Sequence, residues 1–326
     1  MIKFITDSSA DIPAELMQEF DIRPVATHVI WGDQQYADRI DMQPDEFFQR
    51  IQSDPVIPTS STPSIAEFQL AFDQAIRDGA TQIVCMTVSA ALSSTNMTAQ
   101  QAARDYDIPI HVINSCSISM TAGWQLLAGA RLAALGKSID EVLRKIDEVR
   151  KSAIFIAGLD SFIWATRSGR LANLFRIINN AFPVKPIVSI TTQQGKIEPV
   201  SLRRTYNSLK EGLLSSFLKL VPDLQNHRLA IMHANAHIHA MELKEKILRI
   251  AKPVELIVSS TGPVIGIHTG PKALAFCSAR SLDLVRNTIP EYKARAPHRQ
   301  RSTRRRAAIA GSKLAASDQF RLPAFP

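Results

Sequence analysis

Apolar runs and amphipathic stretches alternate along the first 160 residues of the chain. The apolar runs, which are typical of buried strands, lie at 2–6, 25–31, 82–88, 109–114 and 153–158. Between and after them, apolar residues recur at helical spacing over 64–78, 93–106, 118–135 and 138–151. Ser138 and Glu141 have capping-box spacing, so they indicate where the last of these helices begins. The alternation predicts an α/β domain over 1–160 with a parallel, Rossmann-like sheet.

The pattern changes after about residue 160. The segments 185–190 and 196–201 flank Gln193-Gln194-Gly195, which predicts a β-hairpin. The remaining elements are expected as a helix at 205–220, a strand at 228–233, a helix at 238–250 and strands at 254–258 and 273–278. We therefore expect a second α/β domain with a mixed sheet over 161–280.

The net charge of +8 is concentrated at the end of the chain. Residues 281–326 hold ten of the 38 Lys and Arg but three of the 30 Asp and Glu, so 28 basic and 27 acidic residues remain in 1–280. A body so close to neutral has no general attraction for nucleic acid. The Arg-rich and Ala-rich tail, 281–326, is predicted to be disordered. Binding of nucleic acid or anionic lipid is one hypothesis for it, and a solvated tail without a specific partner is the alternative.

The chain has the features of a cytoplasmic protein. No stretch approaches 18 consecutive apolar residues, and the start, Met1-Ile2-Lys3-Phe4-Ile5, lacks the apolar core and cleavage site of a signal peptide. Cys85, Cys116 and Cys277 have neither the number nor the spacing of a disulfide framework or a zinc site.

Hydroxyl-rich segments follow several of the predicted strands. They are Thr6-Asp7-Ser8-Ser9, Thr59 to Ser64, Ser89 to Thr95, and Asn114-Ser115-Cys116-Ser117. Ligands of open parallel sheets bind beyond the carboxyl ends of the strands, where hydroxyls and free helix amides suit an anion. There is no Gly-rich nucleotide motif and no carboxylate grouping typical of a metal site, so a small anionic group such as a carboxylate fits best. Helix capping is the competing explanation for each segment taken alone.

A second segment, Gly262 to Pro271, is dense in glycine and proline and contains His268. Such a composition predicts a loop of defined shape. A lone histidine is more often structural than active, but this one lies in a shaped loop and not on an apolar face.

The order of these motifs resembles that of the DegV family, the fatty-acid-binding subunits of a two-component bacterial fatty acid kinase. The resemblance covers about residues 2–280. The matching pieces are Thr6-Asp7-Ser8, Tyr36-Ala37-Asp38, Ser60-Ser61-Thr62-Pro63-Ser64, Leu92-Ser93-Ser94-Thr95, Ser168-Gly169-Arg170-Leu171, Lys185-Pro186-Ile187, Arg204-Thr205 and Gly262 to Leu274.

The resemblance implies a long-chain fatty acid in an apolar tunnel between the two domains. Its carboxylate would meet Ser60 or Ser61, Ser93 and His268. An ATP-dependent kinase partner would phosphorylate the acid to an acyl-phosphate, a step in phospholipid metabolism. Arg170 and Arg204 would contact this partner or the phosphoryl group; an ordinary surface ion pair is the alternative for each. The chain is then a carrier that is not catalytic alone and that binds the acid without a cofactor or a metal. The sequence leaves its oligomeric state open, and a monomer is the default expectation.

The chain departs from the family pattern at several positions. Ser94 stands for a glycine, which puts a side chain into a turn where glycine would permit a close backbone approach. Asn114 stands where aspartate is usual, and Lys272 replaces a glycine after Pro271.

Two other functions are compatible with parts of the sequence. A serine acyl hydrolase would use Ser93 as nucleophile and His268 as base, although no Gly-x-Ser-x-Gly motif is present. A metal site would use His233, His237 and His239, which fall within seven residues but span a strand end and a helix start.

Overall fold

The computed structural model describes residues 1–167, 184–191 and 193–281. The chain divides into two units, Met1–Arg286 and Asn287–Pro326, and every described residue belongs to the first. Arg170 lies outside the described residues, as does the basic tail beyond Ser281.

Four parallel strands form the sheet of the N-terminal half, sheet A, in the order β2-β1-β6-β7. Their bounds are β1 (Ile2–Asp7), β2 (Ile22–Val25), β6 (Gln82–Thr87) and β7 (Ile110–Asn114). Successive side chains of a strand point to opposite faces, so Ile5 and Ile83 join one core cluster while Phe4 and Val84 join another. Both faces of sheet A are therefore buried, as its near-continuous apolar strands predict.

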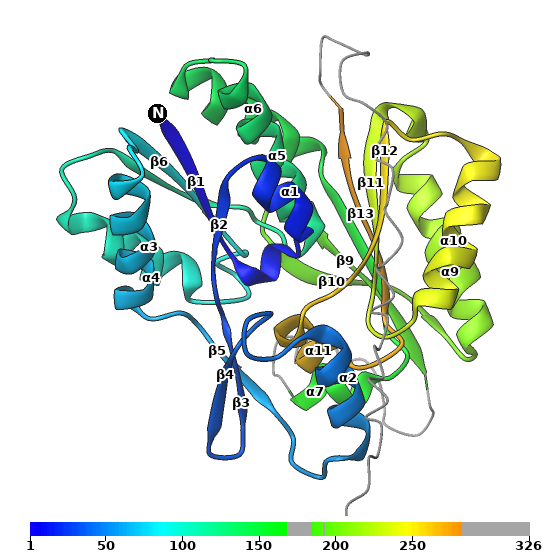
Figure 1. Cartoon of the computed structure of the whole chain (residues 1–326). Coiled ribbons are helices and arrows are strands. Elements are labelled where there is room, and N and C mark those ends of the chain that lie inside the picture. The colour runs from blue at the N-terminus through cyan, green and yellow to red at the C-terminus, as the bar shows by residue number, and fades with distance from the viewer. Residues whose placement is uncertain (168–183, 192, 282–326) are drawn as a thin grey trace, which may run out of the picture. The chain divides into compact units, whose positions relative to one another are not determined.

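Helices cover both faces of sheet A (Figure 1). The helices α3 (Ile65–Arg77) and α4 (Thr95–Ala102) cover one face, followed by the short turn η2 (Ala103–Asp105). On the other face lie η1 (Ser8–Ala10), α1 (Ala14–Glu19) and α5 (Met120–Ala134).

The C-terminal half is built on a six-stranded mixed sheet, sheet D, in the order β10-β9-β8-β13-β11-β12. Its strands are β8 (Ile154–Gly158), β9 (Lys185–Thr191), β10 (Lys196–Arg203), β11 (His227–His233), β12 (Glu255–Ser260) and β13 (Leu274–Arg280). Only β11 and β12 run parallel; the other neighbours are antiparallel. The predicted hairpin is confirmed as β9 and β10.

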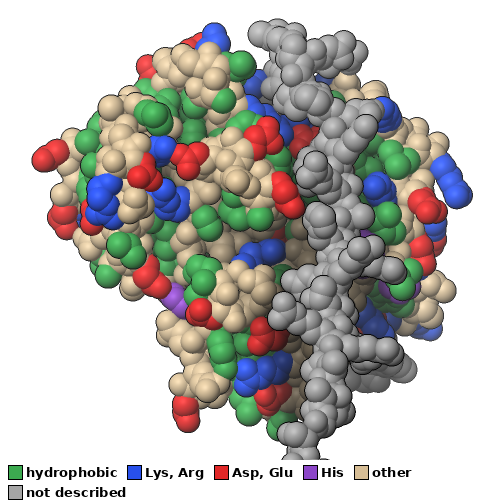
Figure 2. All heavy atoms as spheres, in the orientation of Figure 1, with side chains coloured by type: hydrophobic (Ala, Val, Ile, Leu, Met, Phe, Trp, Pro, Cys, Tyr) green, Lys and Arg blue, Asp and Glu red, His purple; other side chains and the backbone are tan. Residues whose placement is uncertain are grey.

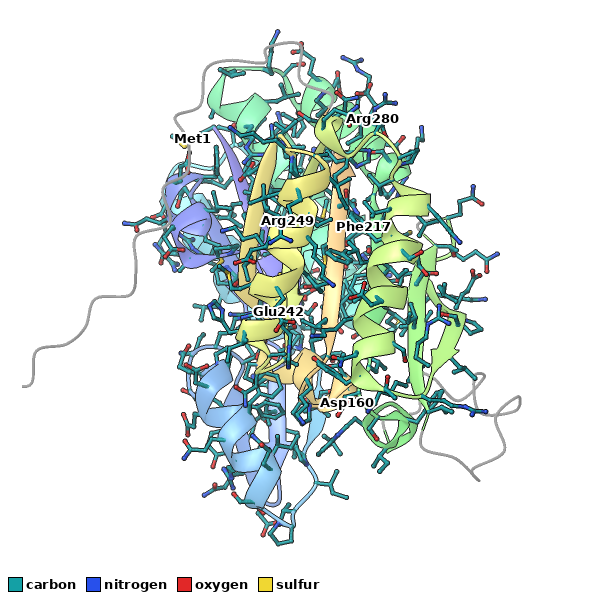
Figure 3. The ribbon with its side chains drawn as sticks, turned by 90° about the vertical axis from the view of Figure 1, so that its right-hand side faces the viewer. Met1, Asp160, Phe217, Glu242, Arg249 and Arg280 are labelled. Atoms are coloured by element: carbon teal, nitrogen blue, oxygen red, sulfur yellow. The ribbon has the colours of Figure 1, made fainter. Side chains whose placement is uncertain are left out.

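Two pairs of helices enclose sheet D. The helices α9 (Tyr206–Leu220) and α10 (His237–Ile250) lie side by side over one face (Figure 3), and η3 (Leu224–Asn226) follows α9. Phe217 of α9 stacks on Phe276 of β13 at 4.4 Å between ring centroids. The other face is covered by α5 and α6 (Ile139–Ser152). The α/β fold with a parallel and a mixed sheet, predicted from the sequence, is thus confirmed.

Helix α5 contacts both sheets. It touches β1 and β6 of sheet A as well as β11 and β13 of sheet D, and Trp124 Nε1 donates a hydrogen bond to the carbonyl of Cys277 at 3.0 Å. Strand β8 precedes the expected domain boundary at residue 160 but pairs with β9 and β13 of sheet D. The division into 1–160 and 161–280 stays a prediction.

A third, small antiparallel sheet carries one of the candidate site residues. It is formed by β3 (His28–Trp31), β4 (Gln34–Ala37) and β5 (Thr59–Ser61), and α2 (Pro44–Ser53), α7 (Phe162–Arg167) and α11 (Pro263–Thr269) accompany it. The sequence predicted one strand over 25–31, but the chain leaves sheet A at Val25 and starts β3 at His28. The other elements of this region were not predicted.

The segment Gly262 to Pro271, expected as a loop, contains the helix α11. Pro263 occupies its first position, and Gly270 ends it with a φ of 69°, the positional preference that these two residues have at helix ends. A Cβ atom on Gly266 would lie 2.6 Å from Cε1 of Phe47, so a glycine is needed where α11 packs against α2. The prediction of a loop was wrong, because Pro263 and Gly270 mark the two ends of a helix and not the interior of a loop.

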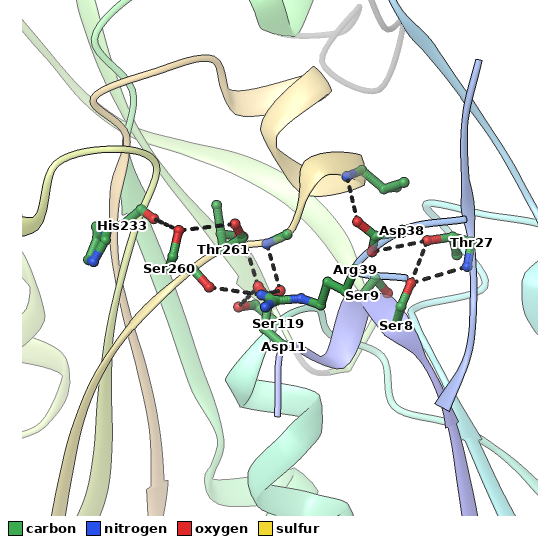
Figure 4. A network of polar contacts seen from close by, with 12 residues as sticks. Ser8, Ser9, Asp11, Thr27, Asp38, Arg39, Ser119, His233, Ser260 and Thr261 are labelled. Atoms are coloured by element: carbon green, nitrogen blue, oxygen red, sulfur yellow. Dashed lines mark hydrogen bonds and ion pairs between the residues drawn. The ribbon is translucent and has the colours of Figure 1, made fainter. Parts of the chain in front are cut away.

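One buried carboxylate joins the start of the chain to the segment before α11 (Figure 4). Asp11 accepts hydrogen bonds from four groups, which together we call the Asp11 hub. The donors and distances are Arg39 Nη2 at 2.6 Å, Ser119 Oγ at 2.7 Å, Thr261 Oγ1 at 2.7 Å and the amide of Gly262 at 2.8 Å. Arg39 also donates to the carbonyl of Ser260 at 2.8 Å. The Asp11 hub therefore fixes the position at which α11 begins.

Charged side chains of both signs are interspersed over the face drawn in Figure 2. In the part of the chain that the structure describes, no helix has the length and apolar character needed to span a bilayer.

We expect Asp11→Asn to destabilise the protein by about 3 kcal/mol, because the amide has one acceptor oxygen in place of two and lacks the negative charge that pairs with Arg39. Urea unfolding should show a lower midpoint with an unchanged slope. Asp107→Asn, which changes an exposed carboxylate, is the control and should leave the midpoint unchanged. Equal midpoints for the two variants would contradict a stabilising role of the Asp11 hub.

Candidate functional site

Two of the candidate residues, Ser60 and His268, are in direct contact. Ser60 lies at the centre of β5 and pairs with Val29 of β3, while His268 lies in the last turn of α11. The distance between Ser60 Oγ and His268 Nε2 is 3.0 Å, although the two residues are 208 positions apart in the sequence. Both residues are partly buried, so a polar group could reach them.

Ser61 lies on the opposite face of the small sheet. It pairs with His28 across β3 and β5, and neighbouring residues of a strand alternate in direction. His28 Nε2 lies 2.9 Å from Oε1 of Glu67, which belongs to α3. The structure thus brings Ser60, and not Ser61, to His268.

Ser93 lies in the loop between β6 and α4. Its hydroxyl pairs with Thr95 Oγ1 at 2.8 Å, and its amide donates to the carbonyl of Ser89 at 3.1 Å. The contact partner of the Ser93 hydroxyl is therefore Thr95 and not His268. The nucleophile–base pair that an acyl hydrolase would need is not assembled in this geometry.

Arg204 is exposed between β10 and α9, next to the helix cap Thr205. It does not contact Ser60, Ser93 or His268. Arg170, the other candidate for a phosphoryl or partner contact, lies outside the described residues.

Most of the hydroxyls at the carboxyl edge of sheet A bond to one another or to the backbone. Ser8 Oγ lies 2.7 Å from Thr27 Oγ1, and Ser115 Oγ donates to the carbonyl of Ser117 at 3.1 Å. Asp7, which is fully buried, accepts from the amide of Val88 at 2.7 Å, and burial raises the pKa of this carboxyl. These segments join the strand ends to one another. More of their hydroxyls therefore serve the structure, and fewer are available to an anion, than the sequence predicted.

Asn114 links two of the loops at this edge. Its Oδ1 accepts from the amides of Ala90 and Cys116 at 3.1 and 3.0 Å. An amide oxygen is sufficient for this task, so asparagine in place of aspartate preserves the contacts.

The two glycine replacements differ in their consequences. Ser94 has a φ of −76° and is exposed, so its backbone conformation does not require glycine. The expectation that its side chain limits a close approach to the turn stays a prediction. Lys272 has a φ of 64°, in the left-handed region that favours glycine.

The three clustered histidines are divided between two environments. His233 Nε2 lies 3.4 Å from His237 Nδ1, whereas His239 contacts Lys210 and Glu242. Within 1–167, 184–191 and 193–281, no three His, Cys, Asp or Glu side chains form a group that could hold a metal ion.

A cavity of about 100 Å³ lies beside the Asp11 hub. Asp38 lines it and accepts a hydrogen bond from the amide of Val264, in the first turn of α11, at 3.3 Å. Burial raises the pKa of Asp38 to about 6, and the neighbouring charge of Asp11 adds to the effect, against the opposing influence of Ser8 and Arg39. The roles of Asp11 and Asp38 were not predicted, because Gly262 and Val264, through which they contact the start of α11, lie more than 200 residues away in the sequence.

The sequence profile of the DegV family, described as uncharacterised proteins, matches residues 1–281. The chain belongs to the DegV family. A DegV-domain protein of Staphylococcus aureus is 28% identical over 270 residues, which cover 83% of this chain and 95% of that protein. A protein of Thermotoga maritima named a fatty acid-binding protein is 25% identical over 280 residues, with 84% and 96% covered.

Solved DegV structures have the same fold. A DegV lipid-binding protein of Thermotoga maritima superimposes with a TM-score of 0.77 at 26% identity, over 86% of this chain and 98% of that one. A DegV protein of Thermus thermophilus gives a TM-score of 0.79 at 24% identity, with 86% and 99% covered. The family predicted from the motif order is therefore confirmed.

Because the folded-state pKa of Asp38 exceeds its ordinary value of 3.8, the native protein holds this proton more tightly than the unfolded chain. Stability should fall as the pH rises from about 4 to about 6, by up to about 3 kcal/mol for a shift of this size. The Asp38→Asn variant has no carboxyl to titrate at this position. Its unfolding free energy should therefore rise relative to that of the wild type over that interval and then level off. Parallel stability curves for the two proteins would show that Asp38 does not contribute.

Lys272→Gly should stabilise the protein by about 0.5–1 kcal/mol, since relief of the left-handed backbone strain exceeds the added entropy of the unfolded chain. Thermal unfolding would show this as a higher midpoint. Lys272→Ala keeps a Cβ atom and serves as the control, with no gain expected. A gain of the same size from alanine would point to the lysine side chain and not to the backbone.

Proposed function

We propose that this DegV protein binds a long-chain fatty acid and places its carboxylate at Ser60, with His268 behind it and Ser93 nearby. The observation that carries the proposal is the contact of 3.0 Å between Ser60 Oγ and His268 Nε2. It is supported by the related Thermotoga maritima proteins, one named fatty acid-binding and one lipid-binding.

The proton arrangement at Ser60 follows from the chemistry of the ligand. An ionised carboxylate only accepts hydrogen bonds, so the Ser60 hydroxyl must donate to it. The same Ser60 oxygen then accepts from His268, which requires the tautomer with hydrogen on Nε2. His268 thus orients the Ser60 hydroxyl without contacting the acid.

Neutral donors suit a site whose affinity comes from the alkyl chain. Each buried methylene contributes about 0.8 kcal/mol, so a long acyl chain in an apolar tunnel supplies most of the binding energy. The carboxylate then needs hydrogen bonds that replace those of water. A weakly held carboxylate also stays available to a second protein.

The protein then acts as a carrier and not as a catalyst by itself. An ATP-dependent kinase partner would phosphorylate the bound acid to an acyl-phosphate. The exposed guanidinium of Arg204 is suited to contact that partner or its phosphoryl group, and Arg170 would share this role.

The central test is the affinity for palmitate, measured by calorimetry after native mass spectrometry has shown an acid-sized mass excess on the purified protein. Ser60→Ala removes one hydrogen bond to the carboxylate, so we expect about fivefold to tenfold weaker binding, equivalent to about 1–1.4 kcal/mol. Thr59→Ala changes the exposed neighbour in the same strand and should bind as the wild type does. An unchanged affinity in Ser60→Ala would remove Ser60 from the site, and the absence of binding by the wild type would refute the function.

A further inference from the structure

The turn of the β9–β10 hairpin touches the loop that carries Ser93. Ser89, two residues after the end of β6, donates from its Oγ to the carbonyl of Gly195 at 2.8 Å. Gly195 lies in the hairpin turn, where its amide donates to the carbonyl of Thr191 at 2.7 Å. The contact joins sheet D to the carboxyl edge of sheet A, and Ser89 is fully buried.

The approach at this contact is close enough to require glycine. Gly195 has a φ of 65°, and a Cβ atom there would overlap the Ser89 hydroxyl and lie 3.1 Å from the Cα of Cys116. The hairpin turn thus packs directly on the two loops that follow β6 and β7. A larger residue would push these loops away.

Ser89 transmits this contact to Ser93 through its own backbone. The Ser89 carbonyl accepts from the Ser93 amide at 3.1 Å and from the Leu92 amide at 3.0 Å. The Ser89 hydroxyl also accepts from the amide of Ala91 at 3.2 Å. One residue therefore determines where the backbone of the Ser93 loop turns.

The geometry points to a role that deepens the proposed function and rests on it. We propose that Ser89 and Gly195 are positioning residues for the carboxylate: the hairpin turn holds the Ser89 hydroxyl, and Ser89 holds the Ser93 loop in the conformation that meets the acid. The C-terminal sheet thereby takes part in recognition of the head group without touching the ligand.

The test compares palmitic acid with its methyl ester, which has the same chain but no carboxylate. In Ser89→Ala, binding of the acid should weaken about fivefold to tenfold, the value of one hydrogen bond, while binding of the ester stays within twofold of wild type. Gly195→Ala should have the same effect. The double variant should lose no more affinity for the acid than the weaker-binding single variant, because both substitutions break the same contact between Ser89 and Gly195.

Ser115→Ala is the matched control. Ser115 is equally buried and lies in the neighbouring loop, and its hydroxyl bonds to Ser117 of the same loop. It should cost stability but leave the ratio of acid to ester affinity unchanged. If Ser89→Ala does not fold, Gly195→Ala carries the test, since it keeps every polar group of the loop.

The outcomes separate this inference from the proposed function. If the wild type prefers the acid and the variants keep the same preference, the positioning role is overturned and the proposed function stays intact. Equal weakening of acid and ester also overturns it, because a general loss of structure would then explain the effect. A wild type that does not distinguish acid from ester refutes the proposed head-group site and this inference with it.

Discussion

The arrangement of the candidate site depends on one buried carboxylate. Asp11 lies near the start of the chain, yet its four donors include Thr261 and Gly262, which immediately precede α11. A buried charge is tolerated only where it is fully hydrogen-bonded. The positive charge of Arg39, which forms an ion pair with Asp11, also compensates the negative charge of this carboxylate. Because α11 carries His268, which contacts Ser60, a polar contact outside the candidate site sets the geometry within it.

The extent to which the sequence predicted the fold follows from the range of the interactions involved. Strands β1, β6 and β11 and helices α3 and α6 were predicted, since each shows its own periodicity and two of them begin with a capping box. The small sheet was missed, because β5 has three polar residues and no apolar alternation. Its strands exist through pairing with β3, which no local pattern reveals.

The same reasoning applies to the site. Ser60 and His268 were named from the motifs, and their contact is in the structure. The choice between Ser60 and Ser61 needed the register of β5 against β3, because a shift of one residue exchanges the two faces of a strand. Ser89 and Gly195 were absent from the predicted site because their contact spans 106 residues and involves a backbone carbonyl, which has no side-chain signature.

Helix α5 and strand β8 have a consequence for how such a chain can be divided. A fragment that ended at residue 160 would keep β8 without β9 and β13, and both of its rows of backbone hydrogen-bonding groups would be open. Open strand edges template association with other chains. The apolar side of α5 that faces sheet D would be uncovered at the same time. The two halves, divided at residue 160, are therefore not independent modules that could be exchanged between relatives.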